Sequence, residues 1–279
     1  MDSNSLCCSL DLVAGSGYTL SVEHRAALQT SFAILKKNYK FNRVLFWGKL
    51  LGLNGDYFIA QGNEGDEMKN KKTFYSFNCV EWHLLGPATD AMIEAVSKAA
   101  RGRFMGDPSH VYECRRQGEG GGATKEEDVP VSNTMQVTEE IRLAVTVHQI
   151  DEEVSVVPRG AFIKNPQGLV QTNRSFEGLS HTEAQKLDNF FHFTEPKNLK
   201  KKSVHEMADL DPSIDFLNPL SDDIPKGCWS LQFECGSNVC VIRSLWWLGL
   251  TFFHVPVTPR HGYIYMGDGS KNVDLPFML

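Results

Sequence analysis

The chain has 279 residues, of which 42% are hydrophobic, with 28 basic side chains against 34 acidic ones and a net charge of −6. Because nucleic-acid binding depends on clustered positive charge, this balance argues against nucleic acid as a partner. The longest apolar run, 245–257, is shorter than the ~20 residues that span a bilayer, and the acidic N-terminus does not resemble a secretory signal. We therefore expect a soluble, cytoplasmic protein without a membrane segment.

The seven cysteines form no even framework and are expected to be reduced. Three of them, Cys228, Cys235 and Cys240, lie close in sequence but lack the CxxC spacing and the paired histidines of a zinc site. We predict no metal, and buried or half-buried apolar roles for most of the thiols.

The first hundred residues carry signals for two helices with three strands between them. Ser21 can cap an amphipathic helix whose apolar residues recur at i, i+4 and i+7. Farther along, Asn54 and Gly55 separate two apolar runs, which is the strongest short signal for a β-hairpin. The predicted elements are a helix at 21–38, strands at 43–51, 56–61 and 73–80, and a helix at 89–100.

The middle of the chain begins with a Gly- and Glu-rich stretch. Residues 106–135 contain few large apolar groups, so we expect a flexible insertion inside one domain. Helix and strand compete for 139–148, and the β-branched residues of 138–157 favour strands. Ser180 and Glu183 have the spacing of a capping box, which predicts a helix that continues to about residue 191.

The last sixty residues are rich in β-strand signals. Gly236 and Asn238, and then Asp268 and Gly269, mark turns beside apolar runs. Strands in hairpin-linked runs, without alternating βαβ units, predict an α+β fold, mainly antiparallel β-sheet with a few packed helices, as a single domain over residues 1–279. The predicted strands here are 229–235, 239–247, 250–255 and 262–266.

No group of residues has the spacing of a catalytic or ligand site. The segment 267–271 lacks the pattern of a phosphate loop, and 209–215 lacks the Gly and Glu of a calcium loop. Cys79 and His83 would lie ~13 Å apart in an extended segment, too far for a thiol and its base. We therefore predict no catalytic residue, no cofactor and no small-molecule substrate.

The apolar residues of the C-terminal sheet point to a surface that needs a cover. Successive side chains of a strand point to opposite faces, so Trp246 and Trp247 would not share one core if the strand ran through both. The second face must be covered by another part of this chain or by another subunit, and Trp is common at interface hot spots. The predicted partner-interface residues are Trp246, Trp247, Phe252 and Phe253.

Several segments resemble a known family from one end of the chain to the other. They are RVLFWGKLLG (43–52), DYFIA (56–60), PRGA (158–161), KGCWS (226–230), RSLWWLGLTFFH (243–254) and NVDLPFML (272–279). These segments closely resemble radial spoke head proteins. The larger paralogues, homologues 4 and 6, have a Trp-Pro-Gly sequence where this chain has Trp247, Leu248 and Gly249, so we expect a different local turn there.

The resemblance implies a non-catalytic structural subunit of the radial spoke head in the axoneme of motile cilia and flagella, part of the cytoskeleton. It implies a role in spoke head assembly and in relaying signals between the central pair and the dynein arms. It also implies other spoke head subunits as partners, chiefly homologues 4 and 6, which the interface residues above would contact. Two alternatives stay open: a cytosolic thiol-dependent enzyme using Cys79 or Cys228, and an interaction adaptor outside cilia.

Overall fold

The computed structural model describes residues 1–3, 5–13, 15, 17, 19–115, 134–196, 205, 208, 210–236 and 238–278. Helices and a large, mostly antiparallel sheet share one chain, which confirms the predicted α+β class. The α-helices are α1 (Leu6–Leu12), α2 (Val22–Tyr39), α3 (Asp90–Ala99) and α4 (Glu139–Val154). The strands are β1 (Arg43–Leu50), β2 (Tyr57–Asn63), β3 (Lys72–Ser76), β4 (His83–Leu84), β5 (Val111–Arg115), β6 (Thr134–Thr138), β7 (Val156–Pro158), β8 (Phe162–Lys164), β9 (Val170–Thr172), β10 (Phe190–His192), β11 (Trp229–Glu234), β12 (Val239–Ser244), β13 (Leu250–His254) and β14 (His261–Gly267).

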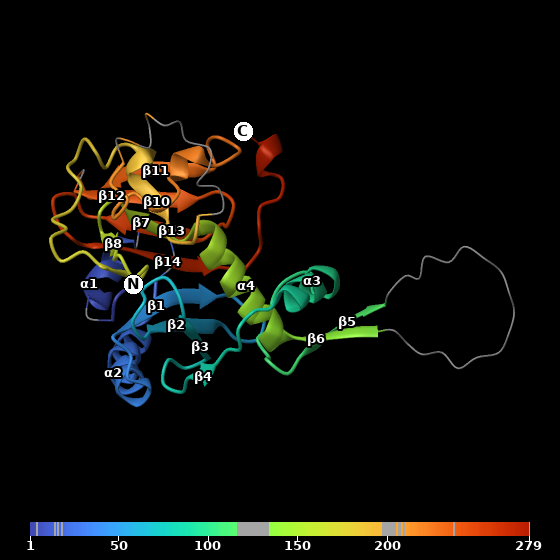
Figure 1. Cartoon of the computed structure of the whole chain (residues 1–279). Coiled ribbons are helices and arrows are strands. Elements are labelled where there is room, and N and C mark those ends of the chain that lie inside the picture. The colour runs from blue at the N-terminus through green and yellow to red at the C-terminus, as the bar shows by residue number, and fades with distance from the viewer. Residues whose placement is uncertain are drawn as a thin grey trace, which may run out of the picture.

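The main sheet joins strands from the two ends of the chain. Its eight strands run in the order β11-β12-β13-β14-β1-β2-β3-β4, and every neighbouring pair is antiparallel except β1 and β14. The predicted pairing of 43–51 with 56–61 and the predicted C-terminal hairpins are confirmed. Figure 1 shows the blue N-terminal strands continuing into the orange and red C-terminal strands.

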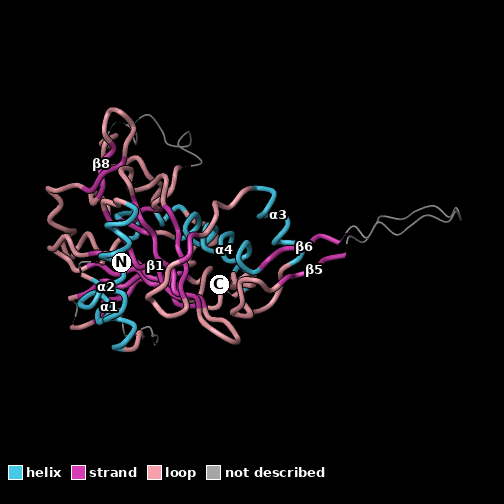
Figure 2. The backbone as a smooth tube through the Cα atoms, turned by 90° about the horizontal axis from the view of Figure 1, so that it is seen from below, coloured by secondary structure: helices cyan, strands magenta, loops and turns pink. Residues whose placement is uncertain are grey.

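Helices cover both faces of this sheet (Figure 2). On one face, Leu28 and Phe32 of α2 pack with residues of α1 and with Phe253 of β13 in one buried cluster. On the other face, Leu143 and Ile150 of α4 pack in a second cluster that contains the neighbouring strand residues. Because both faces are buried, the inner strand β12 is apolar on successive residues, whereas the edge strand β11 alternates apolar with polar residues.

The region predicted to favour strands, 138–157, is mostly helical, so that prediction was wrong over α4. Thr138 caps the helix by accepting a hydrogen bond from the backbone N–H of Ile141 at 3.5 Å. Leu143, Val147 and Ile150 follow at helical spacing and are all buried against the sheet. Burial of this stripe outweighs the modest cost of β-branched residues in a helix. Strand structure resumes only at β7.

The helix predicted after Ser180 is absent from this described part of the chain, although its capping box forms. The backbone N–H of Glu183 donates to Ser180 Oγ at 3.3 Å, and the backbone N–H of Ser180 donates to Glu183 Oε2 at 2.9 Å. After this single turn the chain passes through the 3-10 helix η2 (Leu187–Asn189) into β10, which pairs with β7. Phe190 and Phe191 then enter two different buried clusters, which requires the alternation of a strand.

The ends of the predicted insertion at 106–135 form an antiparallel pair, β5 and β6. Figures 1 and 2 show this pair beside α3, extending away from the main sheet. Val96 of α3 and Val137 of β6 belong to one small apolar cluster with Val145 of α4. Residues 116–133 lie outside the described residues, so the flexibility expected of them stays a prediction.

Gly48 marks the point where the two halves of the sheet meet. Its φ is +152°, β1 is bulged between Phe46 and Gly48, and Gly48 pairs with Tyr265 of β14. A Cβ at this position would lie 2.0 Å from the carbonyl oxygen of Tyr265. Replacing Gly48 by Ala should therefore lower the free energy of unfolding by about 3 kcal/mol, measured by urea denaturation.

Gly65 provides the matched control for this substitution. It lies on an exposed loop, and a Cβ there would meet no atom within 4 Å. Gly65→Ala should change the free energy of unfolding by no more than ~0.5 kcal/mol. If Gly48→Ala were as stable as Gly65→Ala, the close approach of β1 and β14 would not constrain the fold.

Candidate functional site

The most completely buried carboxylate lies at the start of α4. Glu139 has 0% of its surface exposed. Its Oε1 accepts hydrogen bonds from the Tyr57 hydroxyl at 2.7 Å and from the backbone N–H of Gly106 at 2.6 Å and of Asp107 at 3.1 Å. Its Oε2 accepts from the backbone N–H of Met105 at 2.7 Å and from the Tyr112 hydroxyl. One side chain thus joins α4 to β2, to β5 and to the loop between α3 and β5.

These donors decide the charge of Glu139. Burial by itself raises the pKa of this carboxyl, but the hydrogen bonds from Tyr112, Met105, Tyr57 and Gly106 outweigh it and hold the pKa below its ordinary value. The same contact, together with burial, raises the pKa of the Tyr57 hydroxyl far above its usual range. At neutral pH the pair is therefore a neutral phenol that donates to an ionised carboxylate, which is a strong hydrogen bond.

Two acids near the other end of α4 bind aromatic donors, from the sheet and from the turn after β12. Asp151 accepts from Trp47 Nε1 at 2.6 Å, from the Tyr263 hydroxyl at 3.1 Å and from the Gln61 amide. Glu153 accepts from Trp247 Nε1 at 2.8 Å. The helix is thus attached to the sheet by carboxylates at both ends. Because the sequence favours strands over 138–157, it does not predict that these acids lie on a helix that faces the sheet.

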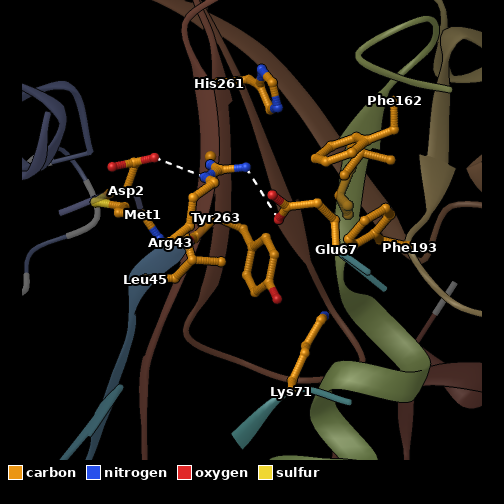
Figure 3. A pocket seen from close by; sticks show the side chains of 13 residues that line it. Met1, Asp2, Arg43, Leu45, Glu67, Lys71, Phe162, Phe193, His261 and Tyr263 are labelled. Atoms are coloured by element: carbon orange, nitrogen blue, oxygen red, sulfur yellow. Dashed lines mark hydrogen bonds and ion pairs between the residues drawn. The ribbon is translucent and has the colours of Figure 1, made fainter. Parts of the chain in front are cut away.

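A pocket lies where β1 and β14 meet the smaller strands β7 and β8 (Figure 3). Its walls include Arg43 and Tyr263 on one side and the rings of Phe162 and Phe193 on the other. The cavity volume is about 50 Å³, enough for a few water molecules and too small for a metabolite.

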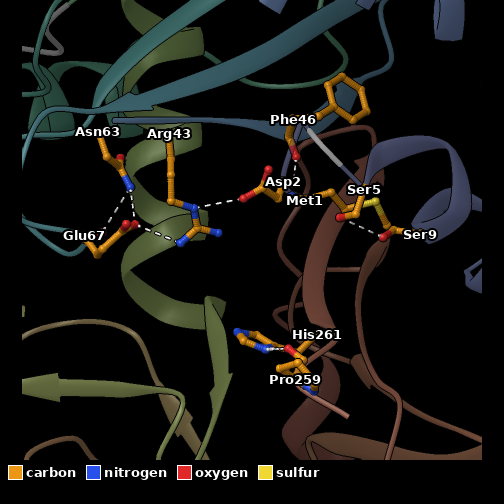
Figure 4. Close-up of polar contacts among 10 residues, drawn as sticks. All are labelled: Met1, Asp2, Ser5, Ser9, Arg43, Phe46, Asn63, Glu67, Pro259 and His261. Atoms are coloured by element: carbon orange, nitrogen blue, oxygen red, sulfur yellow. Dashed lines mark hydrogen bonds and ion pairs between the residues drawn. The ribbon is translucent and has the colours of Figure 1, made fainter. Parts of the chain in front are cut away.

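Charges in this pocket are largely compensated (Figure 4). The Arg43 guanidinium lies 3.0 Å from an Asp2 oxygen and 3.2 Å from a Glu67 oxygen. Burial lowers the pKa of His261 to about 4 and the pKa of the Met1 amino group to about 5, so both are mostly neutral at pH 7. The arrangement joins the N-terminal segment to the sheet and places no nucleophile beside a base.

The thiols proposed for an enzyme are buried. Burial raises the pKa of Cys79 to about 12 and, with the nearby Asp223 carboxylate, the pKa of Cys228 to about 11. Protonated thiols are poor nucleophiles at neutral pH. Within the described residues, no hydrogen bond joins Cys79 to His83. Cys240 is also buried and donates to the Ala184 carbonyl, whereas Cys235 is exposed.

The described residues contain neither a candidate metal site nor a candidate membrane-spanning helix. Over the described ranges, no group of three or more His, Cys, Asp or Glu side chains is arranged to hold a metal ion. The helices in that part of the chain are all too short or too polar to cross a bilayer.

The two tryptophans predicted at an interface lie in a turn after β12, and not in an extended strand as the sequence suggested. Both pack against the same core, so the expectation that they face opposite sides of the sheet was wrong. Trp247 is 4% exposed, whereas Trp246 is half-buried and has Lys271 Nζ 5.1 Å from its ring centroid.

The two phenylalanines, in contrast, do lie on opposite faces of β13. Phe252 packs in the cluster under α4, and Phe253 packs in the cluster under α2. Each is covered by another part of this chain, which was one of the two possibilities left open by the sequence. The prediction that these four residues contact a partner stays a prediction, and Trp246 is the member with the clearest access from outside.

Comparison with known proteins gives a consistent result over the whole chain. A radial spoke head protein 9 homolog from Danio rerio is 64% identical over 282 aligned positions, and those from Homo sapiens and Bos taurus are each 52% identical. Each alignment covers 100% of this chain and 100% of the relative. No protein-family model matches the chain. Identity at this level over the full length shows that the chain belongs to the radial spoke head protein 9 homolog family.

Proposed function

We propose that the protein is a non-catalytic structural subunit of the radial spoke head in the axoneme of motile cilia and flagella. In this role it supports assembly of the spoke head and takes part in relaying signals between the central pair and the dynein arms. The observation that carries the proposal is the full-length identity of 52–64% to radial spoke head protein 9 homologs.

Two features of the chain support a structural role over catalysis. The thiols considered for an enzyme, Cys79 and Cys228, have raised pKa values, and the pocket at Arg43 is too small for a metabolite. Both faces of the sheet are covered within the chain, which produces a rigid body suited to transmitting force. We treat residues 1–279 as a single domain with an insertion near 106–135.

The partners in this proposal are other spoke head subunits, chiefly the paralogues known as homologues 4 and 6. The half-buried Trp246 is the proposed contact residue on the C-terminal turn, because its ring remains partly accessible beside Lys271. An adaptor outside cilia would have the same kind of surface and would differ only in its partners and its location.

Fractionation of cilia tests the location directly. A tagged full-length chain should remain with the axonemes after detergent removes the membrane, because a spoke subunit is held by its neighbours in the cytoskeleton. The tag alone, expressed in the same cells, is the control and should be released. Release of the tagged chain into the detergent-soluble fraction, together with the control, would contradict the proposed function.

Substitution of the two tryptophans separates stability from binding. Trp247→Ala should lower the free energy of unfolding by ~3–5 kcal/mol, since it removes a buried ring and leaves Glu153 without its indole donor. Trp246→Ala should change stability less and weaken binding to the paralogues more, as measured by urea denaturation and by co-purification with homologue 4 or 6. Unchanged co-purification of the Trp246 variant would place the paralogue contact elsewhere.

A further inference from the structure

The loop that leaves α3 presents two arginines beside a fixed backbone. Arg101 and Arg103 are both exposed, and Gly102 between them has a φ of +86°. The next residue, Phe104, is fully buried and forms a parallel bridge with Gly52 at the end of β1. The loop is therefore held on the body of the protein directly after the arginine pair.

A third arginine, which is buried, holds the backbone of this loop. Arg142 of α4 is 6% exposed, and its guanidinium donates to the carbonyl oxygens of Gly102 and Arg103. It also donates to the Tyr112 hydroxyl at 2.8 Å and lies 4.2 Å from the ring centroid of Phe104. Because Tyr112 also donates to Glu139, the loop is tied to the buried anchor at the start of α4.

The two exposed guanidiniums differ from four other arginines of the described residues. Arg25, Arg43, Arg159 and Arg243 each form an ion pair with a carboxylate. Among the described residues, no carboxylate lies within ion-pair distance of Arg101 or Arg103. The nearest ion pair along the chain, Lys98 with Glu94 on α3, adds no net charge. An acidic protein thus carries a local positive site on a loop whose backbone is already ordered.

We infer that the Arg101–Arg103 loop is a docking site for the carboxylates of an acidic polypeptide segment of a partner protein. Guanidinium groups bind carboxylates in a bidentate geometry, and a fixed backbone reduces the entropy lost on binding. The alternative of a nucleic acid is disfavoured because two guanidiniums on one loop do not make the broad positive surface that its binding needs. The inference rests on the proposed function only in taking the partner to be another spoke head subunit.

Fluorescence anisotropy with a labelled octaglutamate peptide tests the site on the full-length protein. Arg101→Gln/Arg103→Gln should raise the Kd for the peptide at least tenfold at low salt, because both guanidiniums are lost. The matched control is Arg174→Gln/Arg260→Gln, which removes the same charge from two other exposed arginines and should leave the Kd within twofold. Arg101→Lys/Arg103→Lys should give an intermediate Kd, because the charge stays while the bidentate geometry is lost.

The inference is overturned if the Arg101→Gln/Arg103→Gln variant binds octaglutamate as tightly as the wild type does. It is also overturned if the wild type binds octaglutamate no more tightly than it binds octaglutamine. Tighter binding to single-stranded RNA than to octaglutamate would also overturn it. Axoneme fractionation keeps the two proposals distinct. Release of the wild-type chain by detergent would refute the proposed function, while the peptide result would still decide whether the loop binds carboxylates.

Discussion

Burying a carboxylate away from water costs several kcal/mol of folding free energy unless hydrogen-bond donors replace its hydration. The donors to Glu139 come from three separate parts of the chain. These donors fix the first turn of α4 relative to the sheet, the β5–β6 pair and the loop that precedes β5. Asp151 and Glu153 repeat the arrangement near the other end of the helix, with indole and phenol donors from the sheet and from the turn after β12. The position of α4 on this face of the sheet therefore depends on the buried Glu139 and on the more exposed contacts of Asp151 and Glu153.

The opposite face is held mainly by aromatic and aliphatic packing. The Phe32 ring lies 5.5 Å from that of Trp82, and Phe46 and Phe253 complete the buried surface. With both faces covered, the large apolar residues of the C-terminal strands are used inside the chain. The residues proposed to contact partners, Trp246, Arg101 and Arg103, lie instead on turns and loops.

The parts of the fold that the sequence predicts are those with local signals. Ser21 caps α2 as expected and accepts from the backbone N–H of His24 at 3.2 Å, and the Asn54–Gly55 connection lies between paired strands. The prediction over α4 failed because long-range burial of Leu143 and Ile150 outweighs β-branched propensity. The capping box at Ser180 made its local hydrogen bonds but not a helix, because Phe190 and Phe191 are needed in two different clusters.

The candidate site was less predictable than the fold. The donors to Glu139 come from Tyr57, from residues 105–107 and from Tyr112, and no local pattern brings such distant segments together. The same holds for Arg142, whose role depends on carbonyl groups of a loop about forty residues earlier. Family resemblance, carried by the segments at 43–60 and 243–254, identified the biological context more reliably than any single residue.

The most direct test of this account is the free energy of unfolding of the wild type and of Glu139→Gln, measured with urea from pH 7 to pH 3.5. The folded state holds the pKa of Glu139 below its unfolded value, so its contribution is complete above the unfolded pKa and is lost as the pH falls through the folded pKa. The account predicts that the variant is less stable by about 2–4 kcal/mol at pH 7 and that the difference shrinks below about pH 4.5. Equal stability at pH 7, or a difference that does not change with pH, would contradict the claim that an ionised Glu139 anchors α4.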